Sequence, residues 1–151
     1  MSLEKRIKQT RFSNLGEKAT INLLVASGFM IQKFDTICAE FDITRGQYNV
    51  LRILRGVYPG GHPRSEIIDR MIERAPDVTR LLDRLEKQGL AERIASSEDA
   101  RLSVARITKK GLKLLDTMSS SIAELDTYLI QKLTDEELVR LSEICEKIYK
   151  E

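Results

Sequence analysis

The stretch VTRLLDRLEKQGLAERIASSEDARLSVARIT, residues 78–108, changes its apolar spacing halfway along. Its first half has apolar residues three or four positions apart, namely Val78, Leu81, Leu82 and Leu85. This spacing predicts an α-helix with one buried face, and Gly89 marks its end. The second half alternates apolar and polar residues on both sides of SSEDAR, residues 96–101, which predicts two antiparallel strands joined at this tip. We therefore expect a helix followed directly by a β-hairpin.

A shorter helix is predicted just before this stretch. Ser65 can cap the segment EIIDRMIE, residues 66–73, in which four apolar residues are expected to point inward: Ile67, Ile68, Met71 and Ile72. The chain then restarts at APD, residues 75–77, because proline suits the first turn of a helix. Two helices joined by so short a turn predict a helix-turn-helix, and the hairpin behind it predicts a wing.

Further helices are predicted on the N-terminal side of this unit. Residues 15–41 carry apolar residues at helical spacing and predict one long helix. Thr44 and Gln47 form a capping box that begins a second helix, which ends at Gly56.

Two more helices are predicted on the C-terminal side. Thr108 can cap a long helix with an apolar face formed by Leu112, Leu115, Met118, Ile122, Leu125, Leu129 and Leu133. A second capping box, Thr134 with Glu137, begins the last helix.

The apolar faces of these flanking helices exceed what a winged unit of about 70 residues can cover. A second copy of the chain is the economical partner, so a homodimer is expected. The residues predicted for its shared core are Leu125, Leu129, Leu133, Leu138, Leu141, Ile144 and Ile148. The predicted fold class is mainly α with a small β-hairpin wing, a winged helix-turn-helix with long N- and C-terminal dimerisation helices.

The composition is that of a globular protein, with 42% hydrophobic and 32% charged residues. No stretch approaches 18 consecutive apolar residues and the N-terminus lacks the apolar core of a signal peptide, so we expect a cytoplasmic protein without a membrane partner. Cys38 and Cys145 are far apart in apolar segments, which favours reduced core thiols over a disulfide. The net charge is only +2, but residues 75–113 hold nine Lys or Arg against six Asp or Glu.

The sequence supports no enzyme class. It has one histidine, no Ser/His/Asp set and no phosphate-binding loop. His62 has no cysteine or carboxylate cluster at ligand spacing around it, so we expect neither a metal site nor a cofactor.

Residues 44–115 resemble the MarR family (multiple antibiotic resistance regulators). The resemblance rests on VTRLLDRLEKQGL, on Asp99 and Arg101 in the hairpin tip, and on the ITxxG pattern of residues 107–111. The family frequently has arginine directly after the motif aspartate, where this chain has Ala100. The resemblance implies a dimer that binds a pseudo-palindromic operator in double-stranded DNA, most often as a repressor. It also implies that a small aromatic or phenolic ligand, or an oxidant, often releases the operator.

A helix-turn-helix reads the major groove with the first residues of its second helix. The expected reading residues are Asp77, Thr79, Arg80 and Arg84, although Asp77 could instead cap the helix. Arg64 and Ser65 are expected to bind phosphates, while Arg101 reaches the minor groove and Asp99 orients its guanidinium. The alternative is a solvated helix face with ion pairs among Arg80, Asp83, Arg84 and Lys87.

We expect residues 1–43 to form an arm and helix that contribute to dimerisation, residues 44–107 to form the DNA-binding domain, and residues 108–151 to complete the dimer. Two other functions stay open from the residues alone. One is a winged helix kept as a protein-interaction module, and the other is a regulator that senses oxidants through cysteine. The side-chain pattern does not identify a ligand pocket.

Overall fold

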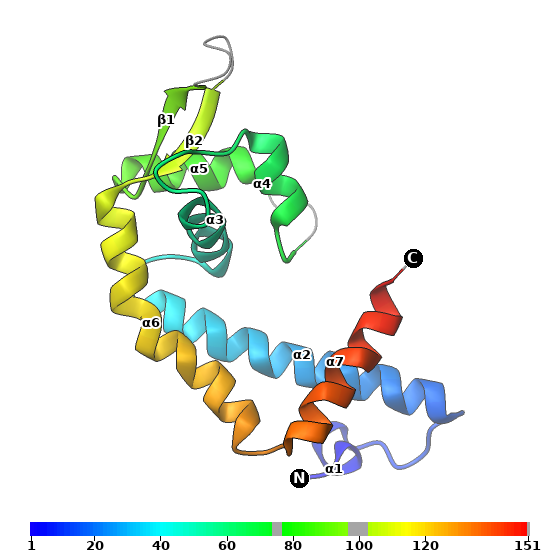
Figure 1. The fold of residues 1–151 in the computed structure, drawn as a ribbon. Coiled ribbons are helices and arrows are strands. Elements are labelled where there is room, and N and C mark those ends of the chain that lie inside the picture. Colours follow the sequence, from blue (N-terminus) through cyan, green and yellow to red (C-terminus); the bar gives the residue numbers. More distant parts are fainter. Residues whose placement is uncertain (74–76, 97–102, 151) are drawn as a thin grey trace.

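The computed structural model describes residues 1–73, 77–96 and 103–150. Its elements are α1 (Leu3–Ile7), α2 (Leu15–Glu40), α3 (Arg45–Arg55), α4 (Arg64–Arg70), α5 (Val78–Lys87), β1 (Ala91–Ala95), β2 (Ser103–Ile107), α6 (Lys109–Ile130) and α7 (Asp135–Tyr149). Helices α3, α4 and α5 and the hairpin form one unit, while α2 and α6 pack against each other beside it (Figure 1). The predicted winged helix-turn-helix is confirmed.

The core of the winged unit lies between α3, α5, the hairpin and the first turns of α6. Its fully buried side chains include Val50, Leu51, Leu54, Ile67, Leu85, Ile107 and Met118. The two strands are antiparallel, with Ala91 opposite Ile107 and Ile94 opposite Val104. This register turns Ala91, Ala105 and Ile107 inward, as the period of two predicts for a sheet covered on one face.

Local capping explains where most helices begin. Thr44 with Gln47 and Thr134 with Glu137 form complete capping boxes at α3 and α7. Thr108 accepts a hydrogen bond from the backbone N–H of Gly111 and caps α6. Each threonine oxygen satisfies an N–H that has no partner within its own helix. These three predicted helix starts are confirmed.

The predicted start of α4 is wrong. The helix begins at Arg64 with Pro63 as its N-cap, and Ser65 lies inside the first turn without capping it. The carbonyl of Pro63 already accepts from Ile67 N–H at 3.2 Å. The fixed φ of Pro63, −64° with an extended ψ of 158°, suits a residue just before a helix, so the helix begins ahead of Ser65.

The predicted inward face of α4 is partly wrong. Ile67 is fully buried and Met71 nearly so, whereas Ile68 is 37% and Ile72 72% exposed. The helix ends at Arg70, and the extended backbone of Met71 takes Ile72 off the helical face. A helix of two turns buries one narrow stripe, and Ile68 lies beside that stripe.

Two details of the C-terminal region also differ from expectation. Helix α6 ends at Ile130, so Leu133 lies in the turn before α7, where its N–H bonds to the carbonyl of Leu129 at 3.0 Å. Cys38 is buried as expected, but Cys145 is only partly buried, as α7 contributes no buried residue.

No helix within the described ranges is long and apolar enough to cross a membrane.

Candidate nucleic-acid interface

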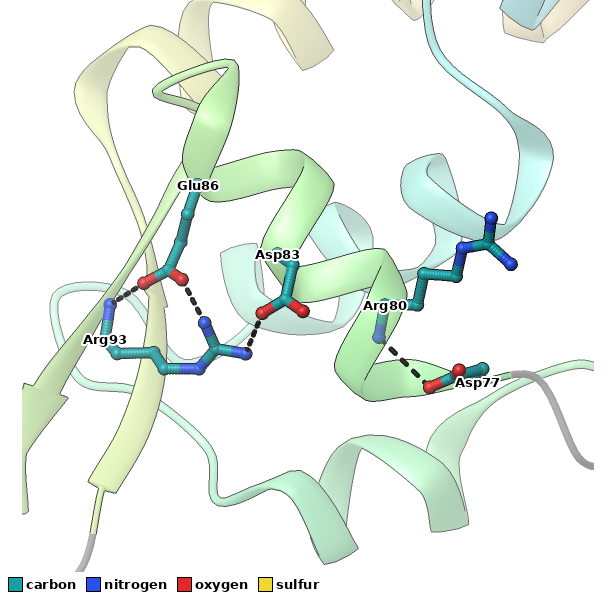
Figure 2. Close-up of polar contacts among 5 residues, drawn as sticks. All are labelled: Asp77, Arg80, Asp83, Glu86 and Arg93. Carbon is teal, nitrogen blue, oxygen red and sulfur yellow. Dashed lines mark hydrogen bonds and ion pairs between the residues drawn. The ribbon is translucent and has the colours of Figure 1, made fainter.

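Helix α5 is the second helix of the helix-turn-helix, and its first turn is held by Asp77. The Asp77 carboxylate accepts a hydrogen bond from the Arg80 backbone N–H at 3.0 Å (Figure 2). A carboxylate at this end also interacts favourably with the helix dipole. Of the two roles considered for Asp77, capping is therefore present in the structure.

The amphipathic character predicted for α5 is confirmed. Val78, Leu82 and Leu85 are buried against the core. The opposite face is exposed and carries Thr79, Arg80, Asp83, Arg84 and Lys87. The buried stripe fixes the rotation of the helix, so this polar face points away from the core.

The acids of α5 are paired with the hairpin and not with the bases of α5. Arg93 of β1 donates to Asp83 at 2.8 Å and also binds Glu86. Within the described part of the chain, the side chains of Arg80, Arg84 and Lys87 have no ion-pair partner. Figure 2 shows the Arg80 side chain extending away from both Asp77 and Asp83. The predicted alternative of ion pairs along α5 is therefore wrong, and no described residue neutralises these three cations.

The hairpin continues α5 through a tight turn. Gly89 has a φ of 70°, a conformation that glycine adopts without strain, and Leu90 N–H bonds back to the Leu85 carbonyl at 2.8 Å. His62 forms an isolated antiparallel β-bridge with Ala105, so the loop before α4 pairs with β2 at this residue. The wing is thus joined to α5 on one side and to the loop before α4 on the other.

Two of the predicted site residues, Asp99 and Arg101, lie outside the described residues. Arg64 and Ser65 lie exposed in the first turn of α4. Sequence reasoning missed Arg93, which joins α5 to β1. Its signal was weak, because an arginine in a polar hairpin is ordinary and its partners depend on how the hairpin packs.

Buried Cys38 has little capacity to react as a thiolate. Burial, helped by the nearby Asp35 carboxylate, raises the pKa of the Cys38 thiol to about 11. A thiol with this pKa stays protonated at neutral pH, and the thiolate is the form that oxidants attack. This environment argues against oxidant sensing at Cys38.

Comparisons with known proteins agree with this geometry. The MarR family model matches residues 43–103. A MarR transcription factor from Planctomyces limnophilus is 34% identical, with a TM-score of 0.69 over 90% of this chain and 98% of that one. The MepR–DNA complex of S. aureus is 27% identical, with a TM-score of 0.76 over 85% of this chain and 94% of that one.

A curated relative gives the same result. The HTH-type transcriptional repressor IacR of Pseudomonas putida is 27% identical over 122 residues, which cover 81% of this chain and 72% of that protein. Together with the capped α5, its free cations and the adjoining wing, these matches show that the chain belongs to the MarR family of DNA-binding transcriptional regulators.

Proposed function

We propose that the protein is a homodimeric repressor that binds a pseudo-palindromic operator and releases it when a small aromatic ligand binds. The proposal that the protein binds DNA rests on the exposed face of α5. There Arg80, Arg84 and Lys87 have no ion-pair partner among the described residues. Basic side chains that fold without a counter-ion are available to DNA. We propose repression and not activation because the relative IacR is named a repressor.

Each reading residue has a role that its chemistry suits. Arg80 and Arg84 can donate in bidentate fashion to the O6 and N7 atoms of guanine in the major groove. Thr79 can contact a thymine methyl group or a phosphate. The Asp77 carboxylate is already used as a cap, so we assign it no base contact.

The remaining predicted contacts lie beside α5. Arg64 and Ser65, in the exposed first turn of α4, are proposed to bind phosphates and so to set the register on the duplex. Arg101 is proposed to enter the adjacent minor groove, with Asp99 orienting its guanidinium.

Fluorescence anisotropy with DNA from upstream of the protein's own gene tests the proposal. We expect salt-sensitive binding that prefers a pseudo-palindrome with half-sites about one turn, roughly 10 bp, apart. Equal affinity for this DNA and for shuffled sequence of the same length would contradict the proposed function.

The proposal of a homodimer rests on apolar side chains that the single chain leaves uncovered. Leu141, Ile144 and Ile148 of α7 are 41%, 44% and 61% exposed. The other predicted members of the shared core are partly buried: Leu125, Leu129, Leu133 and Leu138. Leu24 of α2 is 66% exposed as well. Apolar surface spread over several helices favours association of two copies.

We expect the double substitution Ile144→Asp and Ile148→Asp to shift the monomer–dimer equilibrium toward monomer by about a hundredfold or more, because two charges enter a surface that should be apolar. Analytical ultracentrifugation over a range of concentrations measures this shift. Lys150→Asp, at the exposed end of α7, is the control for added negative charge. A wild-type chain that stays monomeric at high concentration would contradict the dimer.

A cavity of about 230 Å³ is the candidate ligand pocket. It lies between α2, α3, α6 and the segment after α4, and its apolar wall includes Met30, Phe34, Met71 and Leu125. Pockets that bind drug-sized ligands have volumes of about 300 to 1,000 Å³, so this smaller cavity suits a ligand with a single ring.

Arg45 gives the pocket a cationic edge that joins three parts of the chain. Its guanidinium lies 3.2 Å from Asp35 of α2 and 2.7 Å from Glu73, which is four residues before Asp77. The Nε–H of Arg45 is buried and makes no well-aligned hydrogen bond with described residues, even though Asp35 is within ion-pair distance. A ligand acceptor that takes this N–H would compete with Asp35 and shift the guanidinium that also binds Glu73, which would disturb the approach to α5.

We expect a hydroxybenzoate at saturating concentration to raise the unfolding temperature of the wild type by several degrees, because it binds the folded state. Met30→Trp should remove this rise by filling the cavity. Leu23→Trp, on the same helix but outside the pocket, is the matched control. An equal rise in the Met30→Trp protein would exclude this pocket as the binding site.

A further inference from the structure

Arg93 of β1 makes three hydrogen bonds to α5, all to the side chains of two acids (Figure 2). One Nη atom donates to Asp83 at 2.8 Å and the other donates to Glu86. The backbone N–H of Arg93 donates to the second oxygen of Glu86, also at 2.8 Å. The first strand of the wing is therefore bound to the reading helix by both the backbone and the side chain of one residue.

This arrangement fixes direction as well as distance. A guanidinium is planar, and its N–H donors point in fixed directions. Here its two Nη atoms donate to two carboxylates that lie one helical turn apart on α5. Glu86 also holds the strand backbone, so β1 cannot pivot about the Arg93 side chain without losing a bond. Hydrogen bonding to Asp83, reinforced by Glu86, raises the pKa of Arg93 above its usual value.

A second arginine of the hairpin shows what is particular to Arg93. Arg106 of β2 pairs with Glu92 of β1 at 2.6 Å, so its ion pair joins the two strands to each other. The side chains of Arg93 and Arg106 are equally exposed, at 34%. Of these two, Arg93 is the one that joins the hairpin to α5.

We propose that Arg93 is a positioning residue that holds the wing at a fixed angle to α5, so that both can enter adjacent grooves of one operator. Its guanidinium is occupied by two carboxylates, and it therefore contacts no DNA itself. The inference rests on the proposed function, because it requires α5 and the wing to bind DNA together.

For the substitution Glu86→Ala, a purely electrostatic effect and a positioning role of Arg93 predict opposite changes in DNA affinity. Arg93, Asp83 and Glu86 together carry a net charge of −1. Glu86→Ala removes a negative charge beside the DNA-facing helix, so simple electrostatics predicts tighter binding. Positioning predicts weaker binding, because two of the three bonds to Arg93 are lost.

The experiment measures the affinity of the full-length protein for a duplex that the wild type selects from a random pool. We expect Arg93→Met and Glu86→Ala each to weaken binding by about tenfold, on the scale of one lost base contact. Arg106→Met, the matched control, should change affinity by less than about threefold. Unchanged or tighter binding by Glu86→Ala would overturn the proposal, as would an equal loss in Arg106→Met. Thermal unfolding checks that each variant is folded.

A double-mutant cycle with Arg101→Ala tests whether Arg93 acts through the wing. If it does, adding Arg93→Met to the Arg101→Ala variant should lower its DNA affinity little further. Without Arg101, the wing has lost the DNA contact that Arg93 is proposed to position. Fully additive losses would indicate a structural role unrelated to the wing and would overturn the proposal. If Arg101→Ala alone has no effect, the proposed minor-groove contact fails, and the comparison of Glu86→Ala with Arg106→Met still decides the role of Arg93.

Discussion

Replacing Arg80 and Arg84 together with alanine is expected to weaken operator binding by at least about a hundredfold, or roughly 3 kcal/mol, since one good bidentate contact to a base contributes about 1 to 3 kcal/mol. Both side chains are exposed and, among the described residues, have no ion-pair partner. Within the described part of the chain, neither side chain makes a hydrogen bond or ion pair that the substitutions would remove. The unfolding temperature should therefore stay within about 2 °C of the wild type.

The control for this double variant removes the same charge elsewhere. Arg140→Ala with Lys150→Ala also deletes two positive charges, but from α7 and its C-cap, where the two side chains pair with Glu143 and Glu146. Anisotropy titrations with the operator and with unrelated DNA compare the two proteins. The variant in α5 should lose its preference for the operator, while the control should keep it. An equal loss in both proteins would mean that α5 attracts DNA only by charge.

The features that sequence reasoning predicted correctly are those decided within a few residues. The capping box of Thr44 and Gln47 needs two side chains three positions apart, and the structure contains it as predicted. The buried stripe of α5, including Val78 and Leu85, follows from a period that every helix shares. Both strands of the hairpin follow from an equally local alternation.

The features that sequence reasoning missed depend on distant partners. Asp83 has a lysine four residues later on α5, which favours an ion pair along the helix, yet it pairs with Arg93 ten residues away. That choice follows from how β1 packs beside α5, and no local rule contains this information. The cavity proposed as the ligand pocket is a second example, because Phe34, Arg45 and Glu73 meet only after α2, α3 and the segment after α4 have packed together.

Some predictions concern a partner, and the single chain leaves them as predictions. The sequence predicts Ile144 and Ile148 in a shared core because the winged unit is too small to cover them, and both are exposed in the structure. Their exposure is the reason for proposing a dimer. Asp99 and Arg101 stay predictions as well, since both lie outside the described residues.

Gly111→Ala is expected to destabilise the protein by about 1 to 3 kcal/mol, because overpacking a tight core site typically costs about that much. A Cβ at Gly111 would overlap the carbonyl oxygen of Leu90 and come within 2.7 Å of Ile107. The Leu90 carbonyl also accepts from Thr108 N–H at 3.1 Å, so moving it breaks the bond that joins the hairpin to α6. The better helix propensity of alanine, worth about 1 kcal/mol, offsets only part of this loss.

Gly28→Ala is the matched control, and we expect it to have the opposite sign. Gly28 lies within α2, and a Cβ there would have no neighbour within 4 Å among the described residues. Alanine should therefore stabilise this helix by up to about 1 kcal/mol, through the lower entropy of the unfolded chain. Urea unfolding monitored by circular dichroism measures both changes. If Gly111→Ala were as stable as Gly28→Ala, the close approach of α6 to Leu90 would not be needed to join the wing to the long helix, and the wing would depend on its contacts with α3, α5 and the loop before α4.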